Sequence, residues 1–291
     1  MYNRYFTEED LRALIALWFK EDIREGDHTS LCCIPPEKEG CQQLLIKADG
    51  ILAGVEVAKE VVRFFDPELK FEQLLHDGDA VKKGDIAFRV SGKELSLLQV
   101  ERTMLNIMQR MSGIATTVHS YQQLIADTGC RVLDTRKTTP GLRYLEKEAV
   151  RIGGGMNHRI GLFDMILLKD NHIDFAGGVT QALTLARDYC LRKNLDLKIE
   201  VETRNMKEIE EALRTGIPDR LMLDNFTPEA TRDAVRFIRQ WKSGKYVEVE
   251  SSGNIRIDTI RQYAETGVDF VSVGALTHSF KSLDMSFKVV R

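Results

Sequence analysis

Short apolar runs and helix-like stretches alternate along the second half of the chain. Each run ends in polar residues, and the stretch after it has the apolar periodicity of an amphipathic helix. The runs expected to form strands are Arg131–Leu133, Met165–Leu168, Lys198–Val201, Arg220–Leu223, Tyr246–Val249 and Phe270–Val273. The expected helices between them are Leu142–Ile152, Thr180–Lys193, Met206–Thr215, Pro228–Lys242 and Ile255–Thr266. This alternation predicts a parallel sheet with right-handed crossovers, either an α/β barrel or an open doubly wound sheet.

The first half of the chain mixes helices and strands without that rhythm. The expected helices are Thr7–Phe19, which begins with a capping box, Val55–Phe65, and Leu95–Asp127 with a break at Ser112-Gly113; the expected strands are Gln42–Ala48, Phe71–Leu75 and Ile86–Val90. We therefore expect an α+β sandwich domain over residues 1–112 and a catalytic α/β domain over residues 113–275.

Composition excludes several classes of protein. Of 291 residues, 43% are apolar and 29% are charged, which is typical of a soluble globular protein, and the formal net charge of −3 disfavours a nucleic-acid partner. No apolar run approaches the roughly 20 residues of a membrane span, and the N-terminus has no apolar core of signal-peptide type. The five cysteines show no Cys-x-x-Cys spacing, which favours a reduced, cytoplasmic protein.

Cations gather where the expected strands end. Arg136 and Lys137 follow the first run, His158 and Arg159 follow three glycines, and Lys169 ends the second run. Arginine matches carboxylates and phosphates in two-point geometry, so these positions favour an anion-binding pocket. The alternative, a solvated basic face, would follow helical periodicity instead of gathering at element ends.

Two carboxylates, Glu202 and Asp224, end neighbouring expected strands. Carboxylates that face phosphates need a hard cation between them, and Mg²⁺ meets this requirement because it keeps waters and bridges to phosphate oxygens. The alternative is that Asp224 caps the following turn together with Asn225.

Two glycine-containing turns are candidates for phosphate binding. Ser252 and Gly253 lie between an expected strand and a helix, and Gly274 ends the next strand. Barrels often bind phosphate at their last two strand–helix loops through backbone N–H groups, although a plain tight turn would leave the same pattern. His278, just beyond Gly274, is a further candidate for a phosphate contact.

Three motifs in order make the chain resemble the quinolinate phosphoribosyltransferases, which are decarboxylating enzymes of NAD biosynthesis. The motifs are Asp134-Thr-Arg-Lys-Thr138, Gly154-Gly-Met-Asn-His-Arg159 and Lys169-Asp-Asn-His172, and the resemblance extends from Glu21 to Phe287. It implies an incomplete (β/α) barrel with fewer than eight strands, preceded by the α+β sandwich domain, on which the tail of residues 276–291 packs. Asn254 departs from the family, which often has a glycine at this position.

The resemblance also implies a reaction: phosphoribosyl pyrophosphate and quinolinate give nicotinate mononucleotide, pyrophosphate and CO₂. Mg²⁺ is the only implied cofactor. The implied assembly is a homodimer with shared active sites, and a higher oligomer built from such dimers stays open. Implied catalytic residues are Lys137, Lys169, Glu202 and Asp224, of which Glu202 and Asp224 bind the metal. Implied substrate-binding residues are Arg136, His158, Arg159, Lys169, Ser252, Gly253, Gly274 and His278, with Arg102 entering from the partner subunit.

Two other functions remain open at this point. One is a diverged relative, similar to the ModD-like proteins of molybdenum operons, that acts on another base or a mono-acid. The other is a non-catalytic sensor of phosphorylated metabolites. The sensor would not require the pair of carboxylates, so their presence favours an enzyme.

Overall fold

The computed structural model describes residues 4–242 and 244–290, which form two compact units. Within these residues the first unit comprises 4–119, 139–154 and 279–290, and the second comprises 120–138, 155–242 and 244–278. None of the helices in these ranges combines the length and apolar character needed to cross a membrane.

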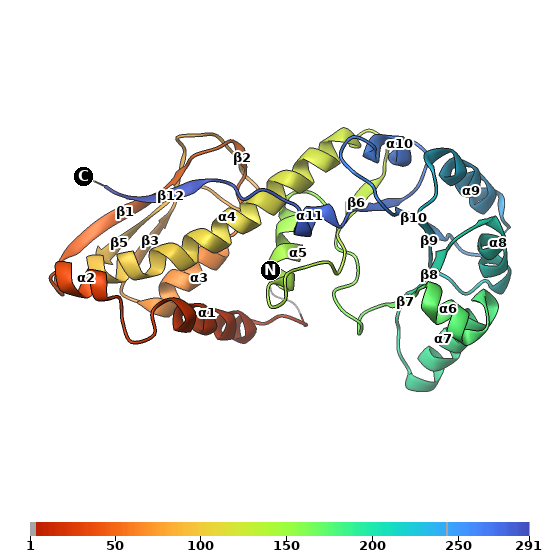
Figure 1. Ribbon diagram of the computed structural model, residues 1–291, viewed down its shortest axis with the longest axis horizontal. Helices are drawn as coiled ribbons and strands as arrows, with labels where there is room; N and C mark the ends of the chain where they lie inside the picture. Colours follow the sequence, from red (N-terminus) through yellow and green to blue (C-terminus); the bar gives the residue numbers. More distant parts are fainter. Residues whose placement is uncertain (1–3, 243, 291) are drawn as a thin grey trace. The chain divides into compact units, whose positions relative to one another are not determined.

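The first unit is built around an antiparallel sheet with the strand order β12-β1-β5-β3. Its helices are α1 (Glu8–Asp22), α2 (His28–Cys33), α3 (Val55–Phe65) and α5 (Arg143–Ile152), and the long α4 (Glu94–Leu124) begins in it. Its strands are β1 (Glu39–Ile46), β2 (Gly50–Ile51), β3 (Lys70–Gln73), β4 (Ala80–Val81), β5 (Ile86–Lys93) and β12 (Met285–Val289). Figure 1 shows β12, from the end of the chain, running beside β1.

Local sequence explains where α1 begins, but it was misleading about α4. The Thr7 side chain caps α1 and the Asp10 carboxylate accepts the Thr7 N–H in return, which is the expected capping box. The break expected at Ser112-Gly113 was wrong, because α4 runs through it without interruption. Gly113 instead allows close approach of the chain: a Cβ at this position would lie 2.4 Å from the Lys281 carbonyl oxygen.

The second unit contains a parallel sheet with the strand order β6-β11-β10-β9-β8-β7. The strands are β6 (Arg131–Leu133), β7 (Ile166–Leu168), β8 (Ile199–Thr203), β9 (Arg220–Asp224), β10 (Glu248–Ser252) and β11 (Phe270–Ser272). The first strand in sequence, β6, pairs with the last, β11, as in a closed barrel. The barrel stays open because β6 and β7 do not pair with each other and form the two edges of the sheet. The expected incomplete (β/α) barrel is therefore confirmed, with six strands.

Helices cover the outer side of this sheet (Figure 1). They are α6 (Asp170–Ala176), α7 (Val179–Lys193), α8 (Met206–Thr215), α9 (Pro228–Gln240) and α10 (Ile260–Ala264). The short α11 (Ala275–His278) follows β11 and does not belong to this outer row. The sequence pattern missed α6, and α10 is shorter than the expected helix at 255–266. Val201, Leu221 and Val249 are fully buried on strands β8, β9 and β10. The alternate positions of the same strands are mostly polar, so the other face of the sheet carries chemistry as well as packing.

Candidate active site

A cavity of about 840 Å³ lies in the second unit, at the carboxyl ends of the parallel strands. This is the usual position of barrel active sites, and the volume suits a small-molecule site. Every candidate residue from the sequence lines it except Arg102, which is exposed on α4. The candidates brought together are Arg136, Lys137, His158, Arg159, Lys169, Glu202, Asp224, Ser252, Gly253, Gly274 and His278.

Asp134 connects the end of β6 to the segment that carries His158 and Arg159. Its fully buried carboxylate accepts the backbone N–H of His158 at 2.9 Å and the side-chain amide of Asn157 at 2.6 Å. The backbone of Met156 pairs with Val132 and Asp134 on either side of Leu133. The two motifs that were separate in the sequence therefore meet at one strand end, and Asp134 is a positioning residue that sequence analysis gave no role.

The cations of the pocket are held close to one another. Burial lowers the pKa of Arg159, and the neighbouring charge of Arg136 lowers it further. The Arg159 guanidinium has the Met165 carbonyl oxygen as an acceptor at 3.4 Å. A buried cation opposed by a second cation is costly in isolation, so an anionic ligand would relieve this arrangement.

Glu202, the last residue but one of β8, and Asp224, the last residue of β9, lie on the same side of the sheet. The pKa of Glu202 is raised by burial first and by the charge of Asp224 second, and Lys169 Nζ lies 3.8 Å from the Glu202 carboxylate. Asp224 also accepts the side-chain amide of Asn225 at 2.8 Å, as the turn-capping alternative requires. Two mutually repelling carboxylates that line a pocket are oxygen donors of the kind that hold a hard divalent cation.

The loop after β10 can be built only with glycine at position 253. Gly253 has φ +106°, and a Cβ there would lie 2.2 Å from the Asn225 side-chain oxygen. Asn254 follows with φ +51°, a left-handed conformation that asparagine tolerates better than most residues. This loop therefore keeps a glycine-like backbone although the chain has asparagine at 254.

Gly274, two residues beyond the end of β11, lies close to two candidate side chains. A Cβ at this position would lie 3.0 Å from Lys137 Cδ and 3.1 Å from His278 Nε2. The Thr277 hydroxyl donates to the Lys137 carbonyl at 2.8 Å, which ties the loops after β6 and β11 together. Lys137, Gly274 and His278 thus share one corner of the pocket.

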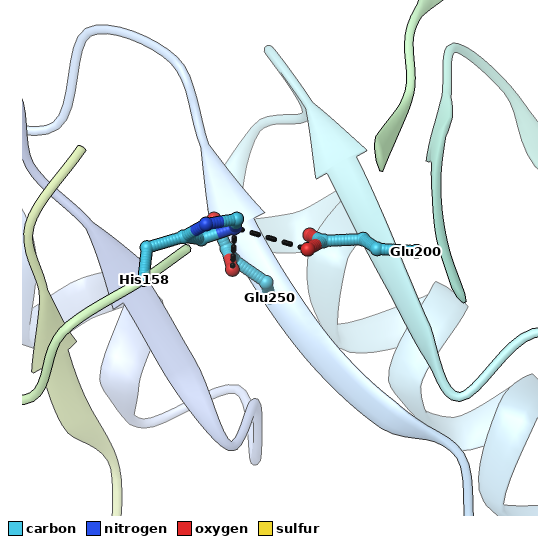
Figure 2. Close-up of side chains that lie close together, drawn as sticks. All are labelled: His158, Glu200 and Glu250. Carbon is cyan, nitrogen blue, oxygen red and sulfur yellow. Dashed lines mark ion pairs between the residues drawn. The ribbon is translucent and has the colours of Figure 1, made fainter. Parts of the chain in front are cut away.

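A second charged cluster lies deeper in the barrel (Figure 2). His158 Nε2 is 3.0 Å from a Glu200 oxygen and 3.5 Å from a Glu250 oxygen, and Arg220 contacts the same Glu250 oxygen at 3.1 Å. Burial raises the pKa of both glutamates. Sequence analysis missed Glu200, Arg220 and Glu250. The available signal was spacing: glutamates at 200 and 202, and at 248 and 250, share a strand face because strands alternate with a period of two.

The geometry of His158, Glu200 and Glu250 brings three ligand atoms within 4.8 Å of one another, close enough for a metal ion. The ring tautomer argues against that reading. The Arg159 N–H donates to His158 Nδ1 at 2.7 Å, so a neutral ring carries its proton on Nε2, toward the carboxylates. A metal-bound Nε2 would need the proton on Nδ1. The cluster is therefore a set of buried ionisable side chains within ion-pairing distance of one another.

Taken together, the open barrel and its pocket of cations, carboxylates and glycine turns define an α/β-barrel enzyme for anionic, phosphorylated substrates. Two family models cover most of the chain: the N-terminal domain of quinolinate phosphoribosyl transferase matches residues 27–112, and the C-terminal domain of the same enzyme matches residues 114–288. The chain belongs to the quinolinate phosphoribosyltransferase family, whose members are pentosyltransferases that make nicotinate mononucleotide for NAD biosynthesis.

Individual relatives agree with this assignment. The chloroplastic nicotinate-nucleotide pyrophosphorylase (carboxylating) of Arabidopsis thaliana is 44% identical over 297 residues, which cover 96% of this chain and 83% of the relative. The structure of NadC from Streptococcus pyogenes superposes with a TM-score of 0.90 at 37% identity, covering 98% of this chain and 99% of the other. The nicotinate-nucleotide pyrophosphorylase of Francisella tularensis gives 0.89 at 37% identity, covering 98% of each chain. The family, the fold class and the enzyme class predicted from the sequence are confirmed.

Proposed function

We propose that the pocket transfers the phosphoribosyl group of phosphoribosyl pyrophosphate to quinolinate, releasing pyrophosphate and CO₂ and leaving nicotinate mononucleotide. The observation that carries the proposal is the gathering of four cationic or donor side chains with two phosphate-type turns around one cavity: Arg136, Arg159, His158 and Lys169, with the loops at 252–254 and 274. Quinolinate carries two adjacent carboxylates, so it needs several such donors in one place.

Phosphoribosyl pyrophosphate is assigned to the residues of the pocket that are not assigned to quinolinate. The backbone at Ser252, Gly253 and Gly274 would bind its phosphates, and Lys137 and His278, which flank Gly274, would add positive charge. Glu202 and Asp224 would hold Mg²⁺, which when bound neutralises charge on the departing pyrophosphate. The same carboxylates oppose the positive charge that builds at the anomeric carbon during transfer.

Loss of CO₂ needs less from the protein. Once the ring nitrogen carries ribose it is cationic, so its charge stabilises the electron pair that the departing CO₂ leaves on the neighbouring ring carbon, and that carbon then takes up a proton to complete nicotinate mononucleotide. The residues of this chain then orient the ring and exclude water, and no organic cofactor is required.

The test is an assay for mononucleotide formation with quinolinate, phosphoribosyl pyrophosphate and Mg²⁺. Nicotinate, with a single carboxylate, should react at least about a hundredfold more poorly, because a matched polar partner is then left unpaired. Arg159→Ala should lose most activity, whereas Arg187→Ala on the surface of α7 serves as the control. Equal turnover of nicotinate would contradict the proposal and favour a diverged relative. Binding of phosphorylated metabolites without turnover would favour a sensor.

We also propose a homodimer with shared active sites, in which Arg102 completes the quinolinate site of the partner subunit, and a cytoplasmic location. Arg102 is exposed on α4, as a residue that serves another subunit would be, and all five cysteines are free thiols. Cell fractionation tests the location, and finding the protein within a sealed organelle would contradict it.

A further inference from the structure

The buried cluster of His158, Glu200, Glu250 and Arg220 raises a physical question. Glu200 and Glu250 are fully buried, and Glu250 lines a pocket that is proposed to bind a dianion. Buried carboxylates cost free energy, and near an anion site they also repel the ligand. Their presence in this layer needs an explanation other than stability.

The layer lies one step below the proposed metal ligand Glu202 and the proposed phosphate-binding residue Ser252. Glu200 and Glu250 precede Glu202 and Ser252 by two residues on the same faces of β8 and β10. Arg220, on the strand between them, contacts Glu250 at 3.1 Å and Glu200 at 3.9 Å, and also contacts Glu248 at 3.0 Å. Arg220 thus balances part of the negative charge without reaching into the pocket.

His158 links this layer to the pocket. The side of its ring that carries Nε2 faces both carboxylates (Figure 2). On the other side of the ring, Nδ1 accepts the Arg159 N–H. The N–H of His158 itself is bound by the Asp134 carboxylate. The ring is therefore fixed on both sides, and the backbone at the start of Arg159 is fixed with it.

We propose that Glu250, together with Glu200, is a positioning residue for quinolinate binding: the two carboxylates orient the His158 ring, and the ring sets the backbone from which the Arg159 guanidinium reaches the substrate. The inference rests on the proposed function. It assigns a role to a layer of side chains that sequence analysis did not single out.

The test compares two isosteric variants on one strand face. Glu250→Gln removes the charge that faces His158 and Arg220, whereas Glu248→Gln removes a charge that faces Arg220 and Lys198 and leaves the contacts of His158 intact. In Glu250→Gln the KM for quinolinate should rise about 10- to 100-fold, as for loss of an outer-shell partner, while the KM for phosphoribosyl pyrophosphate stays within about twofold. In Glu248→Gln both should stay near wild type. An unchanged quinolinate KM in Glu250→Gln, or an equal rise in both variants, overturns the inference.

A double-mutant cycle separates positioning from a general loss of packing. If Glu250 acts through His158, Glu250→Gln should add little to the defect of His158→Ala in quinolinate binding measured by calorimetry. Independent, additive defects overturn the inference. Should Glu250→Gln not fold, as judged by its Tm, Glu200→Gln takes its place in the same cycle. A wild-type protein that neither binds nor converts quinolinate would instead refute the proposed function.

Discussion

Single residues in the pocket carry charge where little water is left to stabilise it. Burial and the charge of Asp224 raise the pKa of Glu202, while burial and the charge of Arg136 lower the pKa of Arg159. In both side chains the surroundings disfavour the charged form. Such residues gain most from a ligand of opposite charge. A divalent cation would relieve the pair Glu202–Asp224, and a carboxylate would relieve the pair Arg136–Arg159.

Removing one proposed metal ligand should therefore impair metal use selectively. In Asp224→Asn we expect a higher Mg²⁺ requirement and a higher KM for phosphoribosyl pyrophosphate, with quinolinate binding largely retained. Titration of activity with Mg²⁺ after chelation measures this, and Asp233→Asn, at an exposed position on α9, is the matched control. Full wild-type activity in excess chelator would refute the metal role.

The pH dependence of stability should report on Glu250. Burial first, and the charge of Glu200 second, raise the pKa of Glu250 from 4.5 to about 7. The folded state therefore binds the proton of the Glu250 carboxyl more tightly than the unfolded state does. The contribution of protonated Glu250 to the free energy of unfolding is fully present below pH 4.5 and is lost as pH rises through about 7. Urea unfolding across this window should show stability falling with pH in the wild type and a weaker slope in Glu250→Gln. Identical slopes in the two proteins would contradict the assignment.

The strand ends and the loops that follow them act as a unit at the next scale. The loop after β9 packs on the loop after β10, where the Asn225 N–H donates to the Ser252 carbonyl at 2.9 Å and the Asn225 side chain occupies the space beside Gly253. Neighbouring parallel strands thus deliver a carboxylate and a proposed phosphate turn to the same place. The spacing between them is set by backbone contacts.

A methyl group at position 253 should disturb this arrangement. In Gly253→Ala we expect the KM for phosphoribosyl pyrophosphate to rise about tenfold or more, because φ is positive and the Cβ would collide with Asn225. Gly129→Ala is a matched control: its φ is +78°, yet a Cβ there meets nothing within 4 Å. Steady-state kinetics and Tm values for both variants separate a local phosphate defect from backbone strain. A similar KM for both variants would argue against a phosphate-binding turn at 253.

At the scale of the whole molecule, the limits of the two sequence domains differ from the limits of the two compact units. The family models meet between residues 112 and 114, near the proposed boundary between domains 1–112 and 113–275. The C-terminal model continues to residue 288, whereas our proposal assigns the tail 276–291 to the first domain. The compact units divide within α4 at 119 and assign α5 to the first unit. We retain the domain limits as a proposal, which limited proteolysis followed by mass spectrometry would test through the position of the first stable cut.

The shared-site proposal predicts complementation between two inactive variants. Loss of one charged donor to a carboxylate should cost about 1.5–3 kcal/mol of binding, so Arg102→Ala and Arg136→Ala should each be severely impaired as homodimers. Under subunit exchange their mixture should regain activity, since some heterodimers place both defects in one site and leave the other intact. A mixture no more active than its components, despite demonstrated exchange, would place Arg102 within its own subunit or outside the site.

Periodicity and motif order in the sequence were enough to predict the six parallel strands, the enzyme family and many, but not all, of the residues that line the pocket, since Glu250 was missed. Local physics explains this success, since strand and helix periods are short-range and parallel strands bring their carboxyl ends to one edge. Tertiary structure alone decided that β6 pairs with β11, that Asp134 holds the backbone of His158, and that Glu200, Arg220 and Glu250 form one buried layer. Those contacts join strands and loops far apart in the chain, so their partners are set by barrel closure and burial and no local pattern specifies them.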